Sequence, residues 1–478
     1  MNIREGLTFD DVLLVPKFSD VTSRSQTDLS TQLSRNISIN IPLISANMDT
    51  VTEASMAVTI AREGGIGIIH RFLTIQEEVN EVLKVKRSGS VMIENPYTIN
   101  PEQTIQNAFT TMNEKQVSGL LVVDSNSKLV GILTERDVLF ELPNCSKLVK
   151  DLMTKDVVTA KQGIDLEKSK EILKKNRIEK LPIIDDNNLV KGLITSQDIS
   201  NLEKYPNASK DSKGRPIVGA AVGVKGDFME RTEALIDAGT DAIVVDIAHG
   251  HSENAINTVK NIKKAFPNCE LIAGNVATAK GTEDLIKAGV DAVKVGVGSG
   301  SICITRVITG SGVPQLTAVM DCAKVGNEHG IPIISDGGTR TSGDATKALA
   351  AGASSIMVGG IFGGTDETPG TTITKNNKRF KIYRGMASLA ASMGRKTKES
   401  GTLELTDDIN DYVAEGVEGM VPYKGSVTDI ITQMTGGIRS GLSYCGAHNI
   451  KQMHKNAEFI KISRAGFAES QPHDVDVM

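Results

Sequence analysis

The sequence predicts an α/β protein, an eight-stranded parallel β/α barrel into which a smaller domain is inserted. Three observations lead to this fold class. Short apolar runs ending in Gly, Asp, Asn or His recur along the 478 residues, mostly with helical stretches between them, as in parallel strands joined by crossover helices. Eight such runs are present, the number of strands in a closed β/α barrel. Residues 71–216 separate the second run from the third, where a helix and its loops need only about 30 residues.

The eight predicted strands are continuous apolar runs because barrel strands are buried on both faces. In chain order they are Leu43–Asn47, Gly65–His70, Ile217–Gly223, Ala242–Ile247, Leu271–Asn275, Val293–Val297, Pro332–Asp336 and Ser355–Gly359. Their polar or glycine C-terminal ends are expected to form the active face of the barrel. An open, doubly wound sheet is the alternative fold.

The long interval contains an internal repeat. Gly119–Val138 and Lys180–Ile199 align without a gap, which predicts two copies of one strand-turn-strand-helix unit. We expect residues 1–92 and 204–478 to form the barrel. The inserted domain is expected at 93–203, with its copies at 93–145 and 149–203. Residues 392–414, a polar stretch near the end of the barrel, are expected to form a mobile flap.

The composition excludes several classes of protein. A net charge of −5, no Trp and 4% aromatic residues disfavour a nucleic-acid or anionic-membrane binder. No stretch reaches the ~20 apolar residues of a membrane span, and the first residues lack the apolar core of a signal peptide. Five scattered cysteines without a CxxC pair favour neither a disulfide framework nor a zinc site. We therefore expect a cytoplasmic protein.

The densest glycine cluster, Gly296–Arg306, follows the sixth predicted strand. Glycines allow backbone groups to approach a ligand closely. Cys303 lies at the tip of this strand, where it is either a nucleophile or an inert packed cysteine. Arg306 either stabilises a thiolate or is a surface charge.

Three glycine segments are candidates for binding phosphate: Gly300–Ser301, Asp336–Gly338 and Val358–Gly364. Loops after the seventh and eighth barrel strands commonly hold phosphate on backbone amides, although each segment alone could simply form a tight turn. The carboxylate of Asp336 would repel phosphate, so it suits a ribose hydroxyl better.

Polar residues at other strand ends provide further candidates. Asp246 could accept hydrogen bonds from a ribose or an amide. His249 and His251 are either acid–base groups or, as we favour, polar loop residues. Glu415 is either a general base acting with Thr305 or a solvated loop carboxylate.

Together these residues resemble the family of inosine-5′-monophosphate (IMP) dehydrogenase, whose superfamily includes guanosine-5′-monophosphate (GMP) reductase. The matching motifs run in order through nearly the whole chain: Gly6–Pro16, Ser45–Glu53, Gly64–Arg71, Asp246–Ser252, Gly274–Thr278, Gly300–Arg306, Ser335–Asp344, Tyr383–Ser388, Glu415–Gly425 and Ala468–Val475. The inserted repeat resembles a tandem pair of CBS modules, also called a Bateman domain.

The resemblance implies oxidation of IMP to xanthosine 5′-monophosphate with NAD, a step of guanine nucleotide biosynthesis, through a covalent thioimidate on Cys303. Thr305 and Glu415 would relay a proton to or from the attacking water. The implied substrate contacts are Ser45, Met48, Ser301, Asp336, Gly338, Gly359, Gly360, Tyr383, Gly385, Met386, Ala387 and Glu415. The implied NAD contacts are Asp246, Gly296 and Gly298.

The resemblance also implies potassium, a homotetramer and a regulatory ligand. The potassium ligands would be Gly298, Gly300 and Cys303, completed by Glu469, Ser470 and Gln471 of a neighbouring subunit. The CBS pair would bind an adenine or guanine nucleotide.

Several positions depart from the family pattern. Ser299 replaces a usual Pro, Gly360 a usual Ser and Ala387 a usual Gly. Arg395–Gly401 lacks the Arg–Tyr pair whose Arg activates water in the dehydrogenases. Either Glu415 with Thr305 is the base, or Arg395 or Lys396 substitutes for that Arg, or the hydrolytic step is weak or absent. Two alternative functions remain open: a GMP reductase, which converts GMP and NADPH to IMP and ammonia, and a nucleotide sensor built on a retired barrel. The long flap and the C-terminal motif favour the dehydrogenase, and the joint presence of Cys303 and Glu415 argues against the sensor.

Overall fold

The computed structural model describes residues 3–89, 92–115, 117–139, 141, 147–389, 391, 393 and 413–472. The chain divides into two compact units. The first, which we call the barrel unit, comprises residues 1–86, 207–211 and 216–478. The second, the inserted unit, comprises residues 87–206 and 212–215. Each is described by itself.

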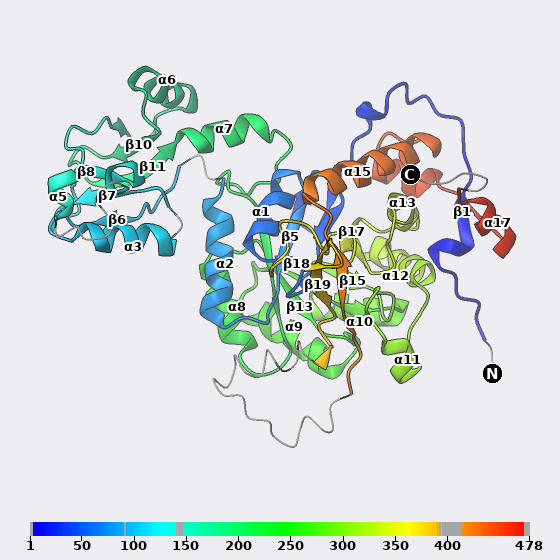
Figure 1. Cartoon of the computed structure of the whole chain (residues 1–478). Coiled ribbons are helices and arrows are strands. Elements are labelled where there is room, and N and C mark those ends of the chain that lie inside the picture. Colours follow the sequence, from blue (N-terminus) through cyan, green and yellow to red (C-terminus); the bar gives the residue numbers. More distant parts are fainter. Residues whose placement is uncertain are drawn as a thin grey trace. The chain divides into compact units, whose positions relative to one another are not determined.

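Eight parallel strands close the barrel, in the order β12-β13-β14-β15-β16-β17-β4-β5 (Figure 1). Each predicted run overlaps one of them, so the predicted barrel is confirmed and the open sheet is excluded. Their bounds are β4 Leu43–Ser45, β5 Ile66–Ile69, β12 Val218–Val222, β13 Ala242–Asp246, β14 Glu270–Val276, β15 Ala292–Val295, β16 Ile333–Asp336 and β17 Ser355–Val358.

Apolar side chains fill both faces of these strands. One buried cluster includes Ile44, Ile68 and Val244. Leu43 and Ile243, which directly precede Ile44 and Val244 in the sequence, belong instead to a larger buried cluster. This alternation is expected of strands whose successive side chains point to opposite faces. It leaves the C-terminal strand ends free to present polar groups.

Helices surround the barrel strands (Figure 1). They are α1 Ala54–Arg62, α2 Ile75–Arg87, α8 Phe228–Asp237, α9 Glu253–Ala265, α10 Ala279–Ala288, α12 Gln315–His329, α13 Ser342–Ala350, α15 Val427–Tyr444 and α16 Ile450–Asn456. Local signals set their ends. The side chains of Thr341 and Asp344 form a capping box that begins α13, and Gly289, with φ of 111°, ends α10 in a left-handed conformation.

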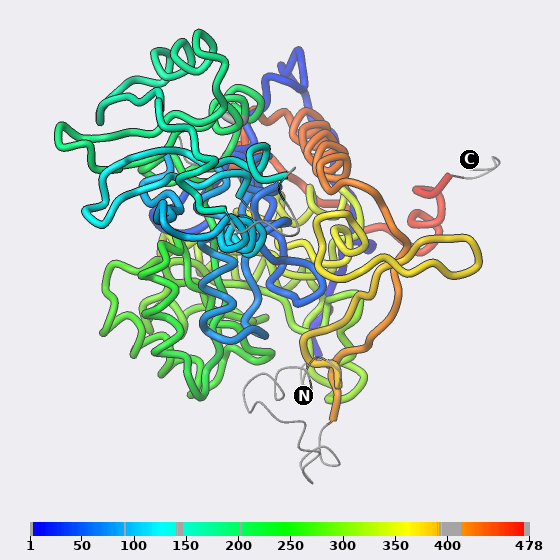
Figure 2. The backbone as a smooth tube through the Cα atoms, turned by 60° about the vertical axis from the view of Figure 1, so that its left-hand side comes forward, coloured from blue at the N-terminus to red at the C-terminus, as the bar shows by residue number. Residues whose placement is uncertain are grey.

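Smaller elements complete the barrel unit. A three-stranded sheet of β18 Ile373–Lys375, β19 Lys378–Arg384 and β20 Glu418–Pro422 extends from it, yellow to orange in Figure 2. β1 Val12–Leu14 pairs with β21 Phe459–Lys461, and β2 Thr31–Gln32 with β3 Ser38–Ile39. The short helices are η1 Phe9–Asp11, η2 Arg24–Gln26, α11 Thr305–Thr309 and α17 Arg464–Glu469.

The inserted unit contains two three-stranded sheets of matching pattern. The first has β6 Thr98–Ile99, β7 Gly119–Val123 and β8 Leu129–Thr134, with α3 Ile105–Lys115, α4 Glu135–Val138 and α5 Val149–Leu152. The second has β9 Ala160–Lys161, β10 Lys180–Ile184 and β11 Val190–Thr195, with α6 Leu166–Asn176 and α7 Ser196–Lys204. In both, a parallel pair is followed by an antiparallel hairpin.

The two copies also end alike. The Thr134 hydroxyl donates to Asp137 at 2.7 Å, and the Thr195 hydroxyl donates to Asp198 at 2.5 Å. These Thr–Asp pairs therefore close a strand-to-helix turn in each copy.

None of the described helices is both long enough and apolar enough to span a membrane. Apart from its ends, the predicted flap, including Arg395–Gly401, lies outside the described residues.

Candidate functional site

A cavity of about 1270 Å³ opens at the C-terminal ends of the barrel strands. Residues at the C-terminal ends of β4, β5, β13, β14, β15, β16 and β17, or in the loops that follow them, line it, as do residues of the Tyr383–Ala387 segment and Glu415. Single drug-sized ligands occupy pockets of about 300–1,000 Å³. This cavity is therefore large enough for more than one ligand.

The loop after β15 carries Cys303 on the cavity wall. Gly298 has φ of 77°, and a Cβ there would lie 2.4 Å from a side-chain carbon of Arg306, so glycine is required. The Arg306 guanidinium donates to the carbonyl oxygens of Val297 at 3.3 Å and Val313 at 2.5 Å. Arg306 thus holds the loop through its carbonyls, which is a positioning role and neither of the two roles that the sequence left open.

A chain of hydrogen bonds leads away from Cys303. Its thiol donates to Thr305 Oγ1 at 3.2 Å, and the Thr305 hydroxyl donates to Glu415 Oε2 at 2.7 Å. Backbone bonds fix the two segments together, since Ile304 N–H donates to the Glu415 carbonyl at 2.8 Å. A proton can therefore pass from the sulfur side to the carboxylate through one hydroxyl.

The other three described cysteines are not equipped for this chemistry. Burial raises the pKa of Cys269 to about 11 and that of Cys322 to about 12, and it also raises the pKa of Cys445. None of the three lines the described cavity. Cys145 lies outside the described residues.

A second group of residues meets around the turn after β17. Tyr383 Oη lies 3.5 Å from Ser301 Oγ, and a Cβ at Gly360 would lie 2.9 Å from that same Oγ. Burial, assisted by the charge of Asp336, raises the pKa of Tyr383, although the hydrogen bond with Ser301 opposes this. The Ser301 hydroxyl therefore adjoins a bare glycine at position 360.

Asp336 and Asp246 share one buried cation. Lys294 Nζ lies 2.7 Å from Asp336 Oδ2 and 3.0 Å from Asp246 Oδ1, and Asn275 Nδ2 donates to Asp336 at 2.9 Å. Burial alone would lower the pKa of Lys294, but the two carboxylates outweigh it and raise that pKa. For Asp246, burial alone would raise the pKa, yet Lys294 and Arg71 lower it overall. Asp246 therefore stays ionised at neutral pH.

Sequence reasoning missed Lys294 and Asn275. The sequence feature that could have revealed them is a lysine inside an otherwise apolar strand run. A buried lysine is almost never found without an opposite charge beside it.

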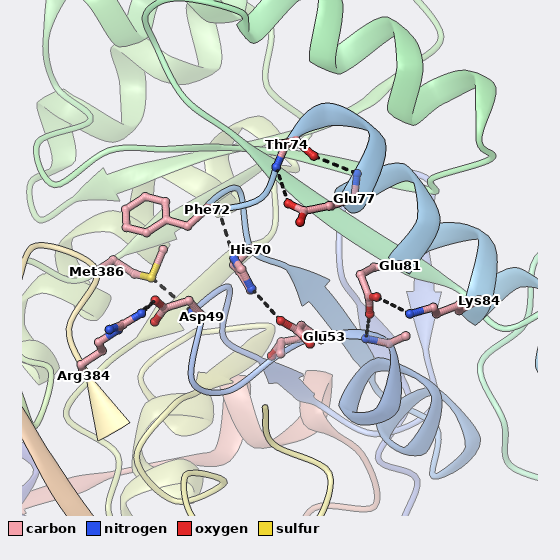
Figure 3. A network of polar contacts seen from close by, with 12 residues as sticks. Asp49, Glu53, His70, Phe72, Thr74, Glu77, Glu81, Lys84, Arg384 and Met386 are labelled. Carbon is pink, nitrogen blue, oxygen red and sulfur yellow. Dashed lines mark hydrogen bonds and ion pairs between the residues drawn. The ribbon is translucent and has the colours of Figure 1, made fainter. Parts of the chain in front are cut away.

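A network of polar contacts beside the cavity positions the segment that carries Met386 (Figure 3). Asp49 accepts two bonds from the guanidinium of Arg384, at 2.9 Å from Nε and 2.5 Å from Nη2. The Asp49 backbone N–H points at Met386 Sδ, 3.3 Å away. In the same view, the buried ring of His70 lies 3.4 Å from Glu53 and accepts the Phe72 N–H at 3.2 Å. The Asp49–Arg384 pair was not foreseen from the sequence.

Most of the expected ligand-binding residues line the cavity: Met48, Asp246, Gly296, Gly298, Gly300, Ser301, Cys303, Thr305, Asp336, Gly338, Gly359, Gly360, Tyr383, Gly385, Met386, Ala387 and Glu415. Ser45 does not; its buried hydroxyl accepts from Thr52 at 2.9 Å. Glu469, Ser470 and Gln471 do not line it either.

The two histidines after β13 also lie off the cavity wall. The His251 ring is 3.0 Å from Asp284, and His249 is exposed. These positions agree with the interpretation of both as polar loop residues.

Comparisons with known proteins agree with this geometry. The family model described as "IMP dehydrogenase / GMP reductase domain" matches residues 6–473. Inosine-5′-monophosphate dehydrogenase of Nitrosopumilus maritimus is 77% identical and covers 100% of both chains. The enzyme of the same name from Aquifex aeolicus is 52% identical over 99% of this chain and 96% of its own.

Among solved structures, a GMP reductase variant of Trypanosoma brucei in complex with guanosine 5′-monophosphate is similar, with a TM-score of 0.92 and 45% identity. The alignment covers 99% of each chain. The chain belongs to the IMP dehydrogenase / GMP reductase family.

Proposed function

We propose that this protein oxidises IMP to xanthosine 5′-monophosphate with NAD. One observation carries the proposal: Cys303, Thr305 and Glu415 are joined by hydrogen bonds of 3.2 and 2.7 Å on the wall of a cavity large enough for a nucleotide and a dinucleotide. The 77% identity to a dehydrogenase over the full chain supports the direction of the reaction.

In the first half-reaction, Cys303 Sγ adds to C2 of the purine and its thiol proton leaves through Thr305. The C2–H bond then breaks with its electron pair, and NAD supplies the acceptor for that hydride when bound. The product on the enzyme is a thioimidate. Sulfur is suited to this step because a thiolate is a strong nucleophile that divides one difficult conversion into two.

In the second half-reaction, water adds to the thioimidate carbon and the C–S bond breaks, which returns the Cys303 thiol and releases xanthosine 5′-monophosphate. A base must take a proton from the water. We assign this role to Glu415 acting through Thr305, whose hydroxyl hydrogen bond to the carboxylate has the required polarity.

The remaining proposed contacts are grouped by the part of the ligand that they bind. Ser301, Tyr383, Gly338, Gly359 and Gly360 are proposed to hold the phosphate of the nucleotide. Asp336 is proposed to hold the ribose hydroxyls, and Met386 and Ala387 to contact the base. Asp246, Gly296 and Gly298 are proposed to contact NAD.

We propose potassium as a second cofactor. The described residues contain no cluster of three or more His, Cys, Asp or Glu placed to hold a metal. The carbonyl oxygens of Gly298, Gly300 and Cys303 are instead the donor type that coordinates potassium. Glu469, Ser470 and Gln471 would complete the site from a neighbouring chain, which implies a homotetramer.

Within the inserted unit, residues 93–203 are proposed to be a tandem CBS domain that binds an adenine or guanine nucleotide. Two sheets of matching pattern support this proposal.

A GMP reductase is the second candidate function. It is favoured by the 45% identity to a GMP reductase over 99% of the chain and by the lack of an Arg–Tyr pair in Arg395–Gly401. In that reaction Cys303 displaces ammonia from GMP, and the same thioimidate accepts hydride from NADPH.

An acid quench during turnover tests the proposal. With IMP and NAD together, the intact mass should rise by that of IMP less two hydrogens, and peptide mapping should place the adduct on Cys303. IMP without NAD should give no adduct. An adduct that forms with GMP alone, and not with IMP and NAD, would contradict the proposal in favour of the reductase.

A further inference from the structure

Five cationic side chains line the described cavity: Arg71, Lys294, Arg306, Arg340 and Lys424. Lys294 is neutralised by Asp246 and Asp336, and Arg340 by Asp10 and Asp344. The Arg306 guanidinium donates hydrogen bonds to the carbonyl oxygens of Val297 and Val313. Arg71 acts on Asp246, at the end of the cavity assigned to the dinucleotide.

Lys424, like Arg306, has no carboxylate partner among the described residues, but Lys424 contacts the turn after β17. Its ammonium donates to the carbonyl oxygens of Gly360 and Ile361, at 2.9 Å each. The side chain is exposed, yet desolvation of its ammonium lowers the pKa of Lys424, with no opposing effect from an acidic neighbour. An ammonium has three donors, and carbonyl oxygens carry no full charge, so the described part of the chain gives this cation no counter-ion.

The backbone fixes Lys424 beside the turn after β17. Its N–H donates to the Gly364 carbonyl at 3.0 Å, and Asp366 N–H donates to the Gly425 carbonyl at 2.9 Å. Residues 359–364 and 424–425 therefore form one built unit. Ser301 Oγ and Tyr383 Oη meet on this same turn, since Cβ atoms at Gly360 and Gly359 would lie 2.9 and 3.1 Å from them.

We propose that Lys424 is a binding residue for the 5′-phosphate of the purine nucleotide, supplying positive charge to a subsite whose other proposed contacts are uncharged. The inference rests on the proposed function, which places a nucleoside 5′-monophosphate in the cavity. The hydroxyls of Ser301 and Tyr383 and the glycine turn provide hydrogen bonds and room, and the ammonium balances the charge of the phosphate. Charge-assisted hydrogen bonds of this kind are about twice as strong as neutral ones.

The test compares IMP with inosine, which lacks the phosphate, by calorimetric binding in the absence of NAD. In Lys424→Gln the amide retains a donor for the Gly360 carbonyl but loses the charge. The Kd for IMP should rise at least about ten-fold, as expected for the loss of a charged hydrogen-bond partner, while the Kd for inosine changes less than about two-fold. Lys424→Arg should retain IMP affinity within about three-fold. Lys375→Gln, on exposed β18 away from the cavity, is the control of equal charge change and should match the wild type.

A second readout separates charge from packing. The second pKa of a phosphate monoester is about 6, so wild-type affinity for IMP should improve between pH 5.5 and 7.5 as the dianion forms. This improvement should be reduced in Lys424→Gln and kept in Lys424→Arg.

Equal weakening of IMP binding and inosine binding in Lys424→Gln, or an unchanged pH profile of its IMP affinity, would overturn the proposal. Lys424 would then only stabilise the turn after β17 through the Gly360 and Ile361 carbonyls. The binding assay does not depend on turnover. Wild-type protein that binds IMP but does not oxidise it with NAD would refute the proposed function and leave the proposed role of Lys424 in phosphate binding intact. Wild-type protein that binds neither IMP nor GMP would refute both.

Discussion

The Thr305 hydroxyl donates to the Glu415 carboxylate at 2.7 Å, although the two residues are 110 positions apart in the chain. The loop after β15 and the segment before β20 are held together by their backbones, because Ile304 N–H bonds to the Glu415 carbonyl and Val417 N–H to the Ile302 carbonyl. The distance is therefore set by two strand-like hydrogen bonds, and the base is in place before substrate arrives.

Glu415→Gln should slow hydrolysis of the thioimidate by about 10²–10⁴-fold, the contribution of a general base, while hydride transfer slows much less. Stopped-flow absorbance should then show a burst of NADH followed by a slow steady state. Glu418→Gln, an exposed neighbour on β20, should behave as the wild type. Equal slowing of both steps would remove Glu415 from the role of base.

Cys303→Ala should abolish turnover and leave IMP binding intact, because the side chain supplies the nucleophile and the phosphate contacts lie elsewhere. Initial rates and calorimetry on the same preparation check both parts. Cys269→Ala serves as the control and should retain activity, since Cys269 does not line the cavity. Activity near wild type in Cys303→Ala would refute the covalent mechanism.

Iodoacetamide at pH 7.5 should alkylate Cys303 before Cys269, Cys322 or Cys445. Burial raises the pKa of the last three thiols, so little of their reactive thiolate exists at this pH. Peptide mass spectrometry over time gives the order, and IMP should protect Cys303. Faster labelling of Cys322 than of Cys303 would contradict the described burial.

Lys294→Met should destabilise the fold by about 3–5 kcal/mol, because it leaves two carboxylates, Asp246 and Asp336, without their shared cation. The pKa of Asp246 is lowered in the folded state, so its contribution is fully present above the unfolded pKa of about 3.9 and is lost as the pH falls through the folded value.

Urea unfolding at pH 7 should therefore show the full difference between the wild type and Lys294→Met, and this difference should shrink below about pH 4. Lys287→Met, at an exposed ion pair on α10, should change stability by no more than about 0.5 kcal/mol. A loss below about 1 kcal/mol at pH 7 in Lys294→Met would show that the buried cation does not hold the carboxylates.

The barrel was predictable because its strands are buried on both faces and read as continuous apolar runs, as at Ala242–Asp246. The positions of Cys303 and Asp336 followed from the rule that chemistry gathers at the C-terminal ends of barrel strands. The pairing of Thr305 with Glu415 was only a candidate until the family resemblance supported it, because the distance depends on backbone pairing between remote segments.

Other parts of the site could not be foreseen. The Asp49–Arg384 pair links residues 335 positions apart, and no local pattern indicates such a contact. Ser45 was expected to contact substrate, but a strand residue alternates between faces, and its hydroxyl is buried against Thr52. Arg306 adjoins the cysteine in sequence, yet the turn at Gly298 places its guanidinium on loop carbonyls.

The measurement that tests the central claim most directly is absorbance at the reduced-nicotinamide band in the presence of potassium, with products quantified alongside. One reaction contains IMP and NAD, and the other GMP and NADPH. The account predicts a rise in the first, with xanthosine 5′-monophosphate formed in equal amount, and no change in the second. A fall in the second with release of ammonia, and no rise in the first, would contradict it.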